Sequence, residues 1–287
     1  MTLRTVIQAV RDGLLSVGYP AQCRLCGSPV ESWDDGVVCH ECWTDPSVTS
    51  TFEHTEVCNR CGNPLYFPEG ASPERPLQLE CPFDRERLCG LCANLSSKAS
   101  RSSGLYKGAL EASILFLKTT PHLCPRLKRI IVQTVDKNAE VLKADLVVPI
   151  PLHPSRLRER GFNQADLISG VVSKALSVPV AKGILARARQ TRRHRAGMDP
   201  VDRGRSVERA FHVERPAQIK GRSVLLVDDV YTTGATIGEA ARSLLDAGAS
   251  GITCFTIARV VPRLRPPAST GFSADFQNQA RPGTARF

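Results

Sequence analysis

The chain has 287 residues, of which 42% are hydrophobic and 23% charged, a composition typical of a soluble globular protein. Its 38 Lys and Arg outnumber its 28 Asp and Glu, and the resulting net charge of +10 favours contact with anions such as phosphates or nucleic acid. No stretch reaches the roughly 18 apolar residues of a membrane helix, so we expect a cytoplasmic protein without membrane insertion. The length predicts one good core plus a smaller unit.

The first residues of the chain predict a short amphipathic helix that packs on the protein. Apolar residues recur near helical spacing from Leu3 to Val17. Arg4, Arg11 and Asp12 interrupt this pattern, which excludes the continuous apolar core of a signal peptide.

Four Cys-x-x-Cys pairs follow between residues 23 and 92. The segments between them contain many turn-forming residues and few apolar ones, so this region could hardly fold by hydrophobic burial alone. Two such pairs supply the four thiolates of a tetrahedral zinc site, which leaves no open position for catalysis. We therefore predict about two structural Zn²⁺ ions, held by Cys23, Cys26, Cys39, Cys42, Cys58, Cys61, Cys89 and Cys92.

The spacing leaves the pairing of these cysteines open. In a sequential arrangement the first four bind one ion and the last four bind the other, whereas a cross-braced arrangement would use the same eight. Cys81 and His40 could each replace one member of a pair. Cys124 and Cys254 lie in or beside apolar segments, which predicts that they are small core residues.

From about residue 104 onward, short apolar strands alternate with amphipathic helices. Helical periodicity is found in residues 105–118, 162–176 and 237–248, and continuous β-type runs in residues 144–152, 223–229 and 251–261. This alternation predicts an α/β fold with a parallel sheet and right-handed crossovers. We expect three regions, namely an N-terminal helix and double zinc ribbon in residues 1–95, the α/β domain in 104–262 and a disordered tail in 263–287.

The segment LLVDDVYTTGAT, residues 225–236, places two adjacent aspartates and several small hydroxyl residues between a strand and a helix. The N-terminus of the helix offers N–H groups and hydroxyls to an anion. The acids lie at the carboxyl end of a parallel strand, where open α/β sheets bind ligands. The segment therefore predicts a site for a phosphate next to a vicinal diol, as in ribose 5-phosphate, whereas a simple capped helix would explain only one hydroxyl.

The same segment resembles the phosphoribosyl pyrophosphate binding motif of type I phosphoribosyltransferases. The resemblance implies a type I phosphoribosyltransferase-like parallel sheet in which Asp228 and Asp229 contact the ribose hydroxyls. It also implies that the loop holds the 5-phosphate through Thr232, Thr233, Gly234, Ala235 and Thr236.

A second stretch, VPIPLHPSRLRERGFNQA, contains three arginines that a solvated basic turn would explain equally well when taken alone. Together with the Asp-Asp motif, it resembles the signature of ComF-type proteins, which join an N-terminal zinc ribbon to a phosphoribosyltransferase domain. The resemblance covers most of residues 20–260, including the YKG...LK segment around Tyr106 and Lys118. It implies that the pyrophosphate of the ligand lies near Pro149, Ile150, Pro151, Leu152 and His153, with Arg160 and Asn163 as further candidates.

The resemblance also implies a cofactor and a mobile loop. A divalent ion, normally Mg²⁺, would bridge the pyrophosphate and the ribose, with ligand oxygens and waters completing its shell. The Arg-rich residues 187–211 correspond to the loop that closes over the substrate in these folds.

Two hypotheses for the function follow. The first is Mg²⁺-dependent transfer of a phosphoribosyl group from phosphoribosyl pyrophosphate to an unidentified acceptor. The second is a non-catalytic protein that senses this ligand or binds single-stranded DNA or DNA-uptake and recombination proteins, because ComF-type proteins are associated with natural transformation. The fold alone does not decide between them.

Overall fold

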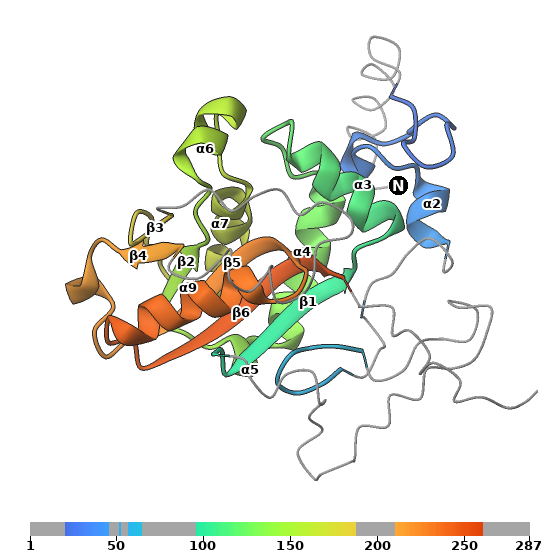
Figure 1. Cartoon of the computed structure of the whole chain (residues 1–287). Helices are drawn as coiled ribbons and strands as arrows, with labels where there is room; N and C mark the ends of the chain where they lie inside the picture. The colour runs from blue at the N-terminus through green and yellow to red at the C-terminus, as the bar shows by residue number, and fades with distance from the viewer. Residues whose placement is uncertain (1–20, 46–51, 53–56, 65–95, 188–209, 261–287) are drawn as a thin grey trace, which may run out of the picture.

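The computed structural model describes residues 21–45, 52, 57–64, 96–187 and 210–260. Its centre is a parallel sheet in the order β1-β6-β5-β2 (Figure 1). The strands are β1 Ala99–Leu105, β2 Leu146–Pro149, β5 Ser223–Tyr231 and β6 Gly251–Arg259. The predicted parallel α/β fold is thus confirmed. The predicted N-terminal helix, most of the Arg-rich loop and the tail lie outside the described residues.

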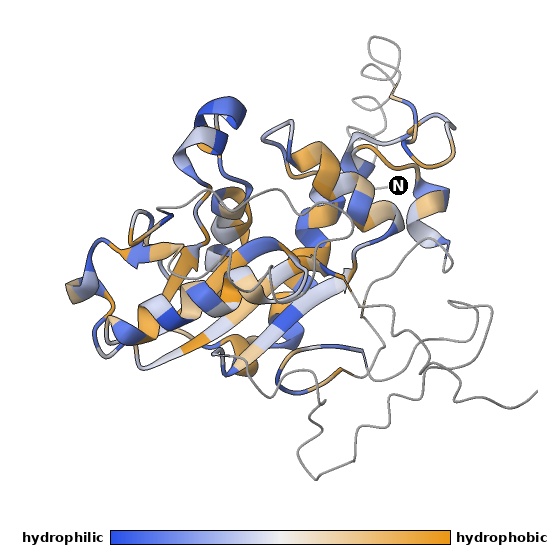
Figure 2. Ribbon diagram, viewed as in Figure 1, coloured by the Kyte–Doolittle hydropathy of each residue, from blue (hydrophilic) through white to orange (hydrophobic). Residues whose placement is uncertain are grey.

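Both faces of the sheet are covered, because alternate side chains of each strand enter two separate cores. The first core contains three helices, α3 Gly108–Leu117, α4 Pro125–Lys137 and α7 Gln164–Leu176. The second core contains α9 Ala235–Asp246. Along β5, Leu225 and Val227 belong to the first core, and Val224 and Leu226 to the second. Figure 2 shows these layers as hydrophobic strands between amphipathic helices.

Local sequence explains where the main helices begin and which side they bury. Helix α4 starts at Pro125, whose fixed φ suits a first helical position, and buries a stripe at four-residue spacing, Leu127, Ile131 and Val135. Helix α7 starts after Asn163, whose side chain accepts a hydrogen bond from the Ala165 N–H group at 3.3 Å. The sequence predicted both α3 and α7, and their positions are confirmed.

Strand β1 was not predicted, because its sequence ASRSSGL is polar. The strand is nevertheless buried except at its last residue, and in Figure 2 it is paler and bluer than its neighbours. Its outer edge is hydrogen-bonded by the cysteine-rich segment: Ser100 N donates to Arg60 O at 2.6 Å, and Phe52 N donates to Ser103 O at 2.8 Å. The cysteine-rich segment therefore covers an edge that would otherwise be open to pairing with another chain.

Shorter elements complete the described part of the chain. They are η1 Trp33–Asp35, α2 His40–Thr44, α5 Ala139–Leu142, α6 Pro154–Arg160, β3 Leu185–Arg187, β4 Phe211–Val213 and η3 Pro216–Gln218. Strands β3 and β4 pair antiparallel at the two ends of the Arg-rich segment. Among the helices of the described residues, none is long and apolar enough to cross a membrane.

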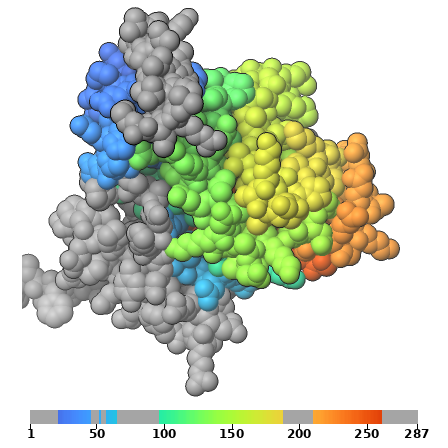
Figure 3. All heavy atoms as spheres, turned by 180° about the vertical axis from the view of Figure 1, so that it is seen from behind, coloured from blue at the N-terminus to red at the C-terminus, as the bar shows by residue number. Residues whose placement is uncertain are grey.

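The first cysteine unit, residues 21–45, packs directly on α3 and α4 (Figure 3, blue against green). The Trp43 indole donates to Asp35 O at 3.0 Å, and Arg126 of α4 donates to Asp35 Oδ1 at 2.8 Å. A Cβ on Gly36 would come within 2.9 Å of the Cys124 Cβ, so a glycine is needed where the two segments meet. The buried side chains of this unit therefore continue the first core of the sheet instead of forming a core of their own.

Candidate functional site

The candidate ligand site is built at the end of β5 and the start of α9. Asp228 and Asp229 are half-buried near the end of the strand, and Thr232 and Thr233 are exposed in the turn that follows. The first N–H groups of α9 have no acceptor within the helix and are available to an anion. The structure thus brings the predicted acids and the predicted phosphate loop into one short segment.

Gly234 is the hinge of this segment. Its φ of +78° is in the left-handed region that disfavours a side chain, and it is the residue from which α9 begins. A Cβ at this position would come within 2.8 Å of the ring carbon that bears the Tyr231 hydroxyl, and closer still to the hydroxyl itself. The glycine is therefore required by the backbone and by the packing of Tyr231 beneath the turn.

The loop after β2 lies beside these acids. Pro149 pairs with Val227, and the Ile150 N–H group donates to Val227 O at 2.9 Å, one residue before Asp228. The side-chain amide of Asn163 donates to Ile150 O at 3.0 Å. Asn163 therefore ties the predicted pyrophosphate loop to the start of α7.

The rest of this loop continues through Pro151 and Leu152 into α6. The His153 ring nitrogen Nδ1 accepts a hydrogen bond from the Ser155 N–H group at 3.2 Å and so caps α6. Sequence reasoning placed these residues near a pyrophosphate, and the structure places their backbone at the same edge of the sheet as Asp228.

Three cations from different elements surround the two acids. Lys118, which follows α3, has its ammonium 3.5 Å from the Asp229 carboxylate and 5.9 Å from the centre of the Tyr106 ring. Burial lowers the pKa of Arg160 in α6, while the charge of Asp229 acts in the opposite direction. Burial likewise lowers the pKa of Arg187 at the end of β3, and the charge of Asp228 opposes this shift.

Lys118 and Arg187 were not among the predicted site residues. Each is a charged residue directly after an apolar helix or strand, GALEASILFL for Lys118 and GILA for Arg187. That position was the available signal, because elements that end at the carboxyl edge of a parallel sheet deliver their last residues to the ligand site.

Asp228 carries the most perturbed carboxyl group of the site. Burial, together with the negative charge of Asp229, raises the pKa of Asp228 to about 8. The Asp229 N–H group donates to Asp228 Oδ1 at 2.9 Å and, with the charges of Arg187 and Lys118, offsets part of this shift. At neutral pH Asp228 is therefore mostly uncharged in the free protein, and a ligand that offers hydroxyl donors or a cation would favour its ionised form.

The first four cysteines of the sequence form a metal-binding cluster. The sulfur atoms of Cys23, Cys26, Cys39 and Cys42 all lie within 4.8 Å of one another, and those of Cys26 and Cys39 are 3.6 Å apart. A Zn–S bond of about 2.3 Å gives a tetrahedron with sulfur atoms roughly 3.8 Å apart, so the cluster fits a zinc ion. Hydrogen bonds from Ser28 lower the pKa of Cys26 to about 6, which favours the thiolate that zinc binds.

A second knuckle repeats the first in sequence and backbone. The segments QCRLCGSP (residues 22–29) and VCNRCGNP (residues 57–64) each close with an isolated antiparallel bridge between their ends. In both, the glycine N–H group donates to the carbonyl of the first cysteine at 2.9 Å, with glycine φ values of +78° and +70°. Cys58 and Cys61 are thus held as in the first cluster, while Cys81, Cys89 and Cys92 lie outside the described residues.

The alternative zinc ligand His40 is not part of the first cluster. Its exposed ring has Nδ1 3.8 Å from the Asp35 carboxylate and 3.2 Å from the Arg126 guanidinium. Cys124 and Cys254 are 6% and 0% exposed, and their prediction as core residues is confirmed.

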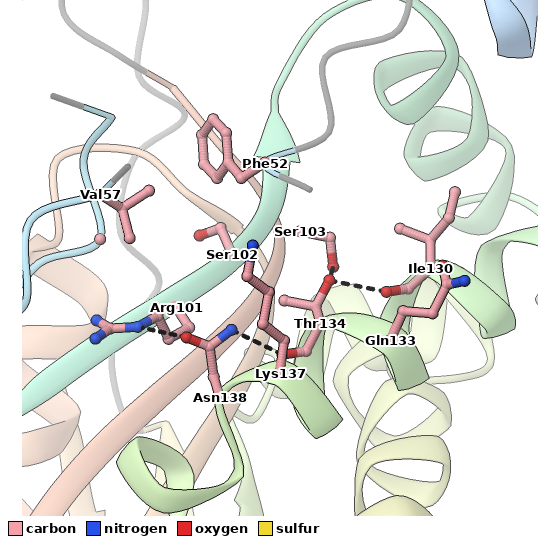
Figure 4. A pocket seen from close by; sticks show the side chains of 11 residues that line it. Phe52, Val57, Arg101, Ser102, Ser103, Ile130, Gln133, Thr134, Lys137 and Asn138 are labelled. Atoms are coloured by element: carbon pink, nitrogen blue, oxygen red, sulfur yellow. Dashed lines mark hydrogen bonds between the residues drawn. The ribbon is translucent and has the colours of Figure 1, made fainter. Parts of the chain in front are cut away.

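A pocket of about 90 Å³ lies between the second knuckle, β1 and α4 (Figure 4). Its polar walls are already hydrogen-bonded to each other: Arg101 Nε donates to Asn138 Oδ1 at 2.8 Å, and Thr134 donates to the Ser103 hydroxyl at 3.0 Å. The pocket contains none of the residues predicted to bind a ligand, and its donors hold the knuckle to the sheet.

The fold and the position of the site define a protein with a phosphoribosyltransferase-type domain, and the family model for the phosphoribosyl transferase domain matches residues 165–279. Among curated proteins, the chain is similar to competence protein F of Haemophilus influenzae, at 33% identity over 135 residues that cover 47% of this chain and 58% of that protein. It is also similar to the DNA utilization protein YhgH of Salmonella typhimurium, at 27% identity over 84% of this chain and 98% of that protein. The predicted resemblance to ComF-type proteins is thereby confirmed.

Similarity among solved structures is low. Glutamine phosphoribosylpyrophosphate amidotransferase from Bacillus subtilis is 20% identical, with a TM-score of 0.30, over 45% of this chain and 24% of that chain. The chain thus spans just over half the length of competence protein F and about a quarter of the amidotransferase.

We expect protein purified without a chelator to contain about two zinc ions per chain, because the cluster and the second knuckle each need an ion to hold their thiolates together. Elemental analysis measures this content. Cys26→Ser should remove about one ion, whereas Cys124→Ala, a matched change of a buried cysteine outside both knuckles, should remove none. A wild-type protein free of zinc would contradict the assignment.

We expect Asp228→Asn to stabilise the folded protein at high pH. A carboxyl group whose pKa is raised on folding loses stability as pH rises through the interval from about 4 to about 8, because the folded state resists its ionisation. Thermal unfolding should show a melting temperature difference between variant and wild type that is small near pH 4 and largest above pH 8. Asp246→Asn, at the end of α9, is the matched amide control. A difference independent of pH would contradict the raised pKa.

Proposed function

We propose that the chain binds phosphoribosyl pyrophosphate, with the 5-phosphate in residues 232–236 and the ribose hydroxyls on Asp228 and Asp229. The observation that carries this proposal is the succession of two half-buried acids and a glycine-hinged helix N-terminus at the carboxyl edge of a parallel sheet. Such a succession offers donors to a phosphate and acceptors to a vicinal diol one turn away.

The surrounding charges favour a ligand with a further phosphate group. Lys118, Arg160 and Arg187 lie around the acids, and the N–H and C=O groups of residues 149–153 form the neighbouring wall. Magnesium carried by the pyrophosphate would neutralise its charge, with Asp228 and Asp229 as the nearby carboxylates that suit a hard cation. Each cation of the protein offsets part of the charge that the ligand brings.

Transfer of the phosphoribosyl group is the reaction that such a site would perform. The bond between the ribose C1 atom and the pyrophosphate oxygen breaks, its electron pair leaves with pyrophosphate, and a lone pair of the acceptor forms the new bond to C1. The protein contributes orientation of the ribose and stabilisation of the departing charge. Release of pyrophosphate in the presence of a panel of bases and amines separates this transfer from binding alone.

We expect calorimetric titration to separate the two halves of the site. Gly234→Val should abolish binding of phosphoribosyl pyrophosphate with Mg²⁺, of ribose 5-phosphate and of inorganic phosphate, because it displaces the turn that forms the cradle. The double variant Asp228→Asn and Asp229→Asn should weaken both ribosyl ligands by about tenfold or more, since each hydrogen bond to a charged acceptor contributes on the order of 1.5 to 3 kcal/mol. It should leave inorganic phosphate binding intact.

The matched control for the loop is Gly238→Ala. This glycine lies one turn further along α9, and nothing lies within 4 Å of an added Cβ, so its substitution should leave all three affinities unchanged. Undiminished binding by Gly234→Val would show that the segment is only a capped helix after a buried strand.

A second candidate function is binding of single-stranded DNA. Helix α6 has no buried residue and carries Arg156, Arg158 and Arg160, so it presents a basic surface. The names of the relatives, competence protein F and DNA utilization protein, favour a connection with DNA. The Arg-rich residues 188–209, which sequence reasoning also connected with DNA, lie outside the described residues.

We expect this binding to be weak, independent of sequence and steeply reduced by salt, because contacts with phosphates release counterions. Fluorescence anisotropy with a labelled oligonucleotide measures the salt slope. Arg156→Ser with Arg158→Ser should lower its magnitude by roughly 1 to 1.5. Lys182→Ser with Lys220→Ser is the control for loss of charge elsewhere. An affinity that does not respond to salt would exclude this function.

A further inference from the structure

The second knuckle is docked on the sheet through three successive backbone carbonyls. Arg101 donates to Asn59 O at 2.9 Å, the Ser100 N–H group donates to Arg60 O at 2.6 Å, and Arg259 donates to Cys61 O. Side-chain identity at residues 59 and 60 does not enter these contacts. The knuckle is therefore held by its backbone shape, which the two cysteines fix.

Arg259 connects this knuckle to the strand that carries the acids. It is the last residue of β6, is 1% exposed, and pairs in register with Tyr231 of β5. Its guanidinium lies 4.5 Å from the centre of the Tyr231 ring, while it also donates to Cys61 O. A guanidinium buried to this extent depends on each of its partners, because water cannot replace them.

Tyr231 in turn supports the phosphate loop. Its side chain is 6% exposed and lies against Gly234 so closely that no side chain fits at that position. A shift of the Tyr231 ring therefore changes the floor on which the turn before α9 rests. The contacts run without a gap from Cys61 through Arg259 and Tyr231 to Gly234.

We propose that Arg259 and Tyr231 are positioning residues that couple the Cys58–Cys61 knuckle to the phosphate loop, so that loosening the knuckle weakens phosphate binding. The proposal rests on the proposed function of residues 232–236. If the knuckle moves, Arg259 loses a buried acceptor and can no longer hold its place over the Tyr231 ring. The first cysteine cluster has a different connection, because it docks on α3 and α4.

A double-mutant cycle tests this coupling. Cys61→Ser and Arg259→Lys are made alone and together, with Cys26→Ser as the matched loss of a cysteine from the other cluster. Hydrogen exchange of the amides of residues 232–238 in the free protein reports loop order, and calorimetry with inorganic phosphate reports affinity. Zinc content and thermal unfolding are followed for each variant.

We expect Cys61→Ser to speed exchange in the loop and to weaken phosphate binding by roughly tenfold, within the range of coupling between residues in contact. Cys26→Ser should change neither readout. In the Arg259→Lys background, Cys61→Ser should have no further effect, because the connection is already broken. Effects of Cys61→Ser and Arg259→Lys that simply add would overturn the proposal.

Two further outcomes keep the test decisive. If Cys61→Ser does not fold, Tyr231→Phe must speed loop exchange while zinc content stays at its wild-type value, and unchanged exchange would overturn the proposal. If the wild type binds no phosphate although loop exchange responds to Cys61→Ser through Arg259, the proposed function fails while the coupling stands.

Discussion

The parallel pairing of β5 with β2 on one side and β6 on the other determines where every candidate ligand contact is made. Residues 224–227 are completely buried in the middle of the sheet, so the strand cannot shift its register without exposing two cores. This constraint brings Asp228 beside the Ile150 loop and Tyr231 beside Arg259. The acids cannot move apart, and their mutual repulsion is balanced by cations that other elements deliver to the same edge.

The cysteine-rich segments have two different relations to this sheet. The first cluster extends the helical layer on α3 and α4, where Trp43 and Arg126 meet at Asp35. The second knuckle covers the polar strand β1, whose outer edge would otherwise present free hydrogen-bonding groups. Metal binding in this chain therefore contributes to the α/β domain itself, because removing either knuckle exposes part of its surface.

The sequence predicted the elements that have a strong period and missed those that depend on contacts. Strands β2, β5 and β6 and helices α3, α7 and α9 were recognisable from apolar runs and helical spacing. Strand β1 was not, because ASRSSGL is buried by a distant segment and has no period of its own. Asp228, Asp229 and the glycine turn were readable from order along the chain. Lys118, Arg187, Arg259 and Tyr231 acquire their positions only through tertiary packing, which no local pattern reports.

The central claim is that the turn after β5 holds a phosphate while the two acids hold the attached ribose. A crystal structure of the chain with ribose 5-phosphate tests it most directly. The account predicts phosphate oxygens within hydrogen-bonding distance of the N–H groups of residues 234–236, and the ribose hydroxyls on Asp228 and Asp229. Ribose 5-phosphate found bound elsewhere on the protein, with this turn empty at saturating ligand, would contradict it.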